Sequence, residues 1–147
     1  MFSTLDLRNC PNISGLSCKG CIGLRSVICT RDESNYVELL SGAFENCAGL
    51  SNLVGYFEIY GSSVFEGCSG IPFDDLLSSG DLKIKFGSSS DFSKAFKGCY
   101  LLGRDSDYPM QFIWSLPPEA NNLTEMFRGT SSNFIMDPDM FCRKVDG

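Results

Sequence analysis

Hydrophobic and polar positions recur along this chain as a short repeat motif with the same order of residue types. The motif typically begins with a small or aliphatic residue, followed by phenylalanine, a charged residue, glycine or asparagine, and cysteine. An aliphatic residue generally follows three places later. The copies occupy residues 17–21, 43–47, 64–68, 95–99 and 126–130. Such self-similarity is typical of a solenoid, in which small units stack on one another instead of surrounding one central core.

Each position of the repeat motif has a physical requirement. Phenylalanine and cysteine are expected to point into the core, whereas the charged residue faces water. Glycine and asparagine tolerate the left-handed backbone conformation that ends a short helical turn. Residues 63–66 and 122–125 have the spacing of a capping box, which predicts where two of these turns begin. The residues expected in the repeat core are Cys21, Phe44, Cys47, Phe65, Cys68, Phe96, Cys99 and Phe127.

Between the motifs, alternating apolar and polar side chains predict half-buried strands. The clearest are residues 56–60 and 82–86, and further strands are predicted at 36–39 and 110–114. Residues 5–13 fit the strand and turn of a leucine-rich repeat.

The spacing between successive motifs indicates the type of solenoid. The fifth positions (Cys21, Cys47, Cys68, Cys99 and Thr130) are 26, 21, 31 and 31 residues apart. These periods bracket the range of roughly 20–29 residues found in leucine-rich repeats. The predicted fold is therefore a repeat solenoid of leucine-rich-repeat type, with short β-strands and one helical turn per coil, and about five to six coils. It forms a single domain over residues 1–147, and the extra residues are expected in loops at 78–81, 87–90 and 103–107.

The motif A-F-x-x-C-x-x-L resembles that of the BspA-like (treponemal-type) leucine-rich repeats. Residues 122–130, N-L-T-E-M-F-R-G-T, look like the related N-x-T-x-M-F-x-x-C/T repeats of bacterial surface proteins. The resemblance covers roughly residues 17–134. It implies a non-catalytic binding or adhesion module at the cell surface or outside the cell, in bacteria or parasitic protists. Because such repeats also occur in phage-encoded proteins, the virion is the alternative location.

The composition of the chain limits the classes of partner that it can bind. With 43% hydrophobic and 20% charged residues, the 147-residue chain is ordinary for one globular domain. A net charge of −6 argues against a nucleic-acid partner, which requires a basic stripe. No run approaches the roughly 18 apolar residues of a membrane span, so membrane insertion is not expected. No signal peptide is visible, and residues 137–147 are not a convincing polar cap, which leaves open that the chain is a fragment of a longer protein.

The candidate chemistry is limited. The chain has no histidine, which removes Ser-His-Asp and Cys-His catalysis and the H-E-x-x-H zinc motif. Cys18 and Cys21 form a C-x-x-C pair that in other settings binds metal or exchanges disulfides. This pair is in register with the repeat motif, so a structural role is predicted and a metal or redox role is the alternative. Equivalent cysteines of stacked coils have parallel side chains, which suit a disulfide poorly, so buried free thiols are expected.

These observations predict that the protein is not an enzyme and has no catalytic residue, cofactor or metal ligand. The candidate site is instead a strand face. If Phe57, Ile59, Leu82 and Ile84 point inward, alternation turns the neighbouring side chains outward. The expected partner-binding residues are Tyr56, Glu58, Tyr60, Lys83 and Lys85.

Exposed aromatic residues carry much of the energy of protein interfaces, so this face favours recognition of a protein or glycan partner. The simpler interpretation is a solvated sheet with cross-strand Glu–Lys pairs. The alternative function is a structural role in a larger assembly such as a phage particle, in which neighbouring subunits dock on the open ends of the solenoid.

Overall fold

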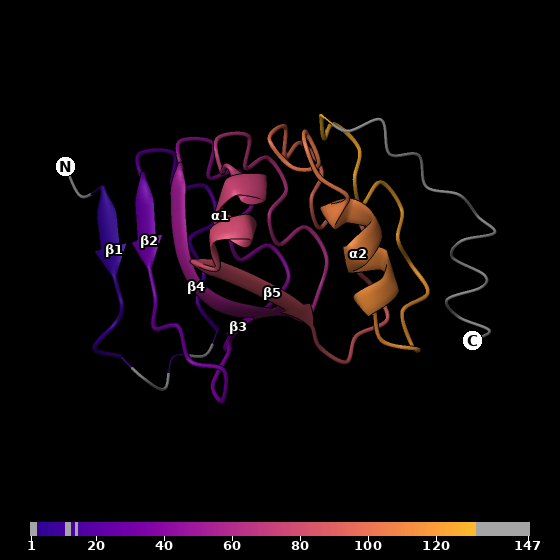
Figure 1. The fold of residues 1–147 in the computed structure, drawn as a ribbon, viewed down its shortest axis with the longest axis horizontal. Helices are drawn as coiled ribbons and strands as arrows, with labels where there is room; N and C mark the ends of the chain where they lie inside the picture. Colours follow the sequence, from indigo (N-terminus) through magenta and orange to yellow (C-terminus); the bar gives the residue numbers. More distant parts are fainter. Residues whose placement is uncertain (1–2, 11–12, 14, 132–147) are drawn as a thin grey trace.

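The strands pair only in parallel in the part of the chain that the structure describes, and three of them, β1, β2 and β4, lie side by side along the long axis of the molecule (Figure 1). The computed structural model describes residues 3–10, 13 and 15–131. The elements, in chain order, are β1 (Thr4–Asp6), β2 (Ser26–Ile28), β3 (Val37–Leu39), β4 (Asn52–Ile59), α1 (Phe73–Ser79), β5 (Leu82–Phe86) and α2 (Tyr108–Ser115). Together they form a parallel-strand β-solenoid of about three turns, which confirms the predicted repeat solenoid.

Strand β4 is the longest strand and pairs with three others. Its first residues pair with β2, and its last residues pair with β3 on one edge and β5 on the other. The two halves of β4 meet at a bend at Gly55, where φ is 143°. A Cβ atom at this position would lie 2.9 Å from Cys29 Cβ, so glycine permits both the bend and the close approach of β2.

The repeat motifs stack on one another through backbone hydrogen bonds. In each of the first four copies, the amide of the second residue donates to a carbonyl of the following copy, at 2.6–2.9 Å. The pairs are Cys18–Ala43, Phe44–Val64, Phe65–Ala95 and Phe96–Met126. The fourth residue of every copy has the predicted left-handed backbone, with φ between 63° and 81°. These residues are Gly20, Asn46, Gly67, Gly98 and Gly129.

The capping-box prediction was wrong at residues 63–66, whereas at residues 122–125 the Asn122 side chain accepts the Thr124 amide at 3.2 Å. Ser63 itself has a left-handed backbone, with φ of 58°, and accepts the Glu66 amide through its main-chain carbonyl at 3.3 Å. The residue before the motif is left-handed in three other copies as well, at Gly42, Lys94 and Glu125. In these four copies the motif is therefore a tight turn, with one left-handed residue before it and another at its fourth position.

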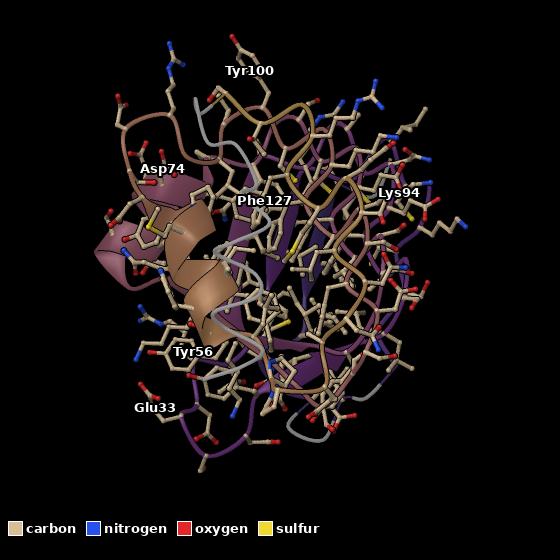
Figure 2. The ribbon with its side chains drawn as sticks, turned by 90° about the vertical axis from the view of Figure 1, so that its right-hand side faces the viewer. Glu33, Tyr56, Asp74, Lys94, Tyr100 and Phe127 are labelled. Carbon is tan, nitrogen blue, oxygen red and sulfur yellow. The ribbon has the colours of Figure 1, made fainter. Side chains whose placement is uncertain are left out.

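The phenylalanines of the motif form a continuous stack, as predicted. The rings of Phe44 and Phe65 are 5.6 Å apart and 5° from parallel, and those of Phe96 and Phe127 are 5.7 Å apart and 5° from parallel. Phe65 and Phe96 complete the column at 5.7 Å. All four side chains are buried, and Figure 2, which looks along the solenoid, shows Phe127 near the centre of the molecule. This column is the spine of the hydrophobic core.

The cysteines of the second, third and fourth motifs, Cys47, Cys68 and Cys99, are fully buried. The thiols of Cys47, Cys68 and Cys99 donate to carbonyl oxygens of the preceding copy at 2.9, 3.0 and 3.1 Å. Burial raises the pKa of all three thiols, so they stay protonated and can donate. Each cysteine therefore fills space as a small hydrophobe and satisfies a carbonyl of its neighbour.

Two predictions about individual segments were wrong. Cys21, expected in the repeat core, is exposed, whereas Cys18 is buried. In later copies the fifth-position thiol is buried against a preceding copy, and no such copy packs on residues 17–21 in the described part of the chain. Residues 110–114 are helical, within α2, because Pro109 lies in the first helical turn and Phe112 and Ile113 are buried at helical spacing from it.

Candidate interaction face

The predicted partner-binding residues lie on neighbouring strands and form one cluster, here called the tyrosine–lysine face. The parallel register places Tyr56 opposite Lys83 and Glu58 opposite Lys85. Tyr36, which precedes β3, extends the row, and its ring is 5.6 Å from that of Tyr56. The residues of the face are Glu33, Tyr36, Tyr56, Glu58, Tyr60, Lys83 and Lys85.

Both lysines contact tyrosine rings. Lys83 Nζ lies 4.9 Å from the centre of the Tyr56 ring, and Lys85 Nζ lies 4.1 Å from the centre of the Tyr36 ring. Such contacts contribute about 0.5–1 kcal/mol at exposed sites. Lys83 also pairs with Glu33, and Lys85 Nζ is 3.8 Å from a Glu58 carboxylate oxygen. The two ammonium groups are therefore held between aromatic rings and carboxylates.

The tyrosine hydroxyls complete the network. Tyr60 donates to Glu58 Oε1 at 2.8 Å, and Tyr36 donates to Glu33 Oε2 at 3.3 Å. The hydrogen bond to Glu58 raises the pKa of Tyr60, and partial burial raises that of Tyr36. The ion pair with Lys83 lowers the pKa of Glu33. The face thus brings phenol hydroxyls, ammonium groups and carboxylates together in one hydrogen-bonded and ion-paired network.

Sequence reasoning found most of this face but missed two members. Tyr36 could have been found from the strand predicted at 36–39, because the same alternation that turns Tyr56 outward turns Tyr36 outward. Glu33 gave no local signal, because it reaches Lys83 from a loop 50 residues earlier in the chain. In Figure 2, Glu33 and Tyr56 lie on one side of the molecule and Lys94 on the opposite side. The tyrosine–lysine face and Lys94, the residue before the fourth motif, therefore lie on different sides of the molecule.

One inserted loop near α1 is held by a single carboxylate. Asp74, in the first turn of α1, accepts hydrogen bonds from the Gly103 amide at 2.8 Å, the Asp105 amide at 2.9 Å and the Ser106 hydroxyl at 2.8 Å. Figure 2 shows Asp74 at the edge of the molecule next to α1. The predicted loop at 103–107 is therefore ordered by a side chain from the previous coil.

Replacing Asp74 by alanine is expected to loosen this loop. Because hydrogen bonds to charged groups contribute about 1.5–3 kcal/mol when buried and these are partly exposed, we expect a loss of about 1–2 kcal/mol. Hydrogen exchange should show loss of protection at the Gly103 and Asp105 amides. Asp75→Ala, at the exposed neighbouring position, is the matched control and should leave both amides protected. Equal exchange in the two variants would contradict the role of Asp74.

The C-x-x-C pair does not have the features of a reactive site. Burial raises the pKa of the Cys18 thiol to about 11, whereas the attacking cysteine of a redox enzyme has a lowered pKa. Among the described residues, no group of three or more histidine, cysteine, aspartate or glutamate side chains could hold a metal ion.

Thiol labelling of the native, reduced protein should therefore separate two classes of cysteine. Cys10 and Cys21 are exposed and are expected to react with a thiol reagent at pH 8. Cys18, Cys47 and Cys99 should react only after unfolding, because they are buried and protonated. Peptide mapping by mass spectrometry checks each site, and rapid native labelling of Cys18 would contradict the expectation.

No model of a known protein family, no curated protein and no solved structure matches this chain. The chain is a parallel-strand repeat solenoid with one aromatic and charged surface, the tyrosine–lysine face. No helix in the described ranges has the length and apolar character needed to cross a membrane.

Proposed function

We propose that this protein is a non-catalytic recognition module that binds a protein or glycan partner through the tyrosine–lysine face and the inserted loops. We also propose that it is a BspA-like leucine-rich-repeat solenoid of five to six coils, each with a strand and a single helical turn, and that it acts at the cell surface or outside the cell. The resemblance of the motif and its copy-to-copy hydrogen bonds support the class. The observation that carries the function is the fixed arrangement of Tyr36, Tyr56, Lys83 and Lys85.

Preorganisation is the physical basis of the proposal. Binding costs free energy when flexible side chains become ordered, by about 0.5–1.5 kcal/mol for each one. On this face the long side chains of Lys83 and Lys85 already pack on tyrosine rings and pair with carboxylates. A partner that binds here therefore orders little that is not already ordered, and the tyrosines supply large, partly exposed contact areas.

The charges of the face favour a partner that forms hydrogen bonds over a polyanion. Each lysine has a glutamate partner, so the cationic charge is locally neutralised. The chain as a whole carries −6, which disfavours nucleic acid. Phenol hydroxyls, carboxylates and ammonium groups together suit the mixed donors and acceptors of a peptide or a neutral glycan.

Two defined probes test this function. The purified chain is screened against a printed panel of glycans and, separately, against a displayed peptide library. Wild-type protein is expected to enrich a ligand in one arm, and Tyr56→Ala should weaken that binding roughly tenfold or more, since hot-spot residues contribute above about 1.4 kcal/mol. Tyr100→Ala is the matched control, because Tyr100 is 57% exposed and lies away from Tyr56 in Figure 2.

The outcomes that would overturn the proposal are specific. Enrichment in neither arm contradicts it, and so does a ligand that Tyr56→Ala and Tyr100→Ala bind equally well. Unfolding curves of both variants show whether a loss of binding reflects a loss of folding. If both variants are folded, Lys85→Ala provides a second test of binding at the tyrosine–lysine face, because Lys85 is exposed on that face.

A second function, a structural role in an assembly such as a phage particle, is favoured by one observation. Within the described residues, β1 pairs with β2 only, so its other edge is open, and Ile22 near the same end is 71% exposed. An open strand edge is a template for adding further strands. Light scattering over a concentration series tests this alternative: concentration-dependent oligomers support it, and a monomer at all concentrations contradicts it.

A further inference from the structure

Two cysteines outside the buried thiol column line one cavity at the N-terminal end of the solenoid. Cys10 follows β1 and is exposed, whereas Cys29 follows β2 and is buried. Both line the same cavity of about 30 Å³. Most of the other lining residues come from the first two strand regions and the loop after them. They are Leu7, Ile13, Thr30, Asp32, Asn35 and Val37.

Backbone and side-chain hydrogen bonds hold the two cysteine segments together. The Leu7 amide donates to the Ile28 carbonyl at 2.7 Å, which places Leu7 beside Cys29 at the usual separation of about 4.8 Å between strands. The Cys10 amide donates back to the Leu7 carbonyl at 3.0 Å, so Cys10 lies within one tight turn of Leu7. The Thr30 hydroxyl donates to the Arg8 carbonyl at 3.1 Å and ties the same turn to the residue after Cys29.

This geometry differs from that of the buried column. Cys47, Cys68 and Cys99 occupy equivalent positions of successive coils, and each thiol is directed at a carbonyl. Cys10 closes a turn and Cys29 follows a strand end, and the two residues line one cavity from different backbone positions. Convergent side chains on neighbouring segments are what a disulfide requires.

We infer that Cys10 and Cys29 are an oxidisable pair that forms an intramolecular disulfide closing the N-terminal end of the solenoid, with a low-molecular-weight disulfide as the oxidant. This modification is independent of partner binding at the tyrosine–lysine face. It covalently joins the first strand region to the second and leaves the buried column reduced.

The reaction balances as two successive exchanges. The exposed Cys10 thiolate attacks one sulfur of oxidised glutathione, which forms a mixed disulfide and releases one glutathione thiolate. The Cys29 thiolate then attacks the Cys10 sulfur, forms the protein disulfide and releases the second glutathione. Two protein thiols are oxidised and one glutathione disulfide is reduced. Burial raises the pKa of Cys29 to about 11, so the second step accelerates as the pH rises above neutrality.

The test uses the full chain, purified in reduced form and incubated with oxidised glutathione at pH 8. After acid quenching and alkylation, peptide mapping without reduction should show a Cys10–Cys29 cross-link and a protein lighter by two hydrogens. The cross-link should be absent in Cys10→Ser and retained in Cys21→Ser, the matched control at the other exposed cysteine among the described residues. Oxidation should also raise the thermal midpoint of wild type by roughly 5–10 °C, and leave Cys10→Ser unchanged.

Three results would overturn the inference. They are a stable glutathione adduct on Cys10 with Cys29 still reduced, a cross-link between Cys10 and Cys21, and a cross-link between two chains. Mapping of the wild-type protein decides among these outcomes without any variant, so a misfolded Cys10→Ser does not affect the conclusion.

Discussion

Phe96→Ala is expected to lower the free energy of unfolding by about 3–5 kcal/mol, the range for removing a large buried aromatic side chain. Phe96 has no exposed surface and lies in the middle of the phenylalanine column. Its ring is 5.7 Å from those of Phe65 and Phe127 and 4.9 Å from that of Phe112. The substitution therefore opens a cavity between neighbouring coils and removes stacking on both sides.

Denaturant unfolding measures this effect, and two variants calibrate it. Phe96→Leu keeps most of the buried volume and should cost less than half as much, because the remaining cavity is smaller. Tyr100→Ala removes an exposed ring just after the same motif and should change stability by less than about 0.5 kcal/mol. If Phe96→Ala lowers the free energy of unfolding by less than about 1.5 kcal/mol, the phenylalanine column is not the main source of the stability of the core.

The features that sequence predicted well are those in which one residue type meets one local requirement. Glycine or asparagine fills the fourth position of the motif because the backbone there is left-handed in every copy. Phenylalanine recurs because each ring packs on the ring of the next copy. The outward positions of Tyr56 and Lys83 followed from strand alternation and the parallel register. These relations repeat along the chain, so a single sequence was enough to detect them.

The errors came from contacts that depend on what lies next to a segment in space. Residues 110–114 have apolar side chains that suit either a strand or a helix. They form part of α2, which packs against β5. Cys21 has the residue type of the buried column, but its burial depends on a preceding copy and not on its own motif. Glu33 joins the tyrosine–lysine face only through the path of a loop. None of these outcomes is encoded in a local pattern.

Gly67→Ala is expected to destabilise the protein by about 2–5 kcal/mol, for two separable reasons. Gly67 has φ of 81°, a conformation that costs a residue with a side chain about 1–2 kcal/mol. An added Cβ would also lie 2.6 Å from Asn46 Oδ1 and 3.2 Å from Asn46 Cα, in the preceding copy of the motif. Relieving such overpacking typically costs a further 1–3 kcal/mol, so backbone strain and the clash between coils act together.

Gly20→Ala separates these two contributions, because Gly20 occupies the same motif position with φ of 74° and has no atom within 4 Å of an added Cβ. Its free energy of unfolding should fall only by the cost of the left-handed backbone, about 1–2 kcal/mol. The difference between the two variants in denaturant unfolding then measures how closely successive coils are packed. If both variants lose the same stability, the contact between Gly67 and Asn46 is loose enough to accommodate a methyl group. In that case the glycine column is required by the left-handed turn alone and not by the stacking of the motifs.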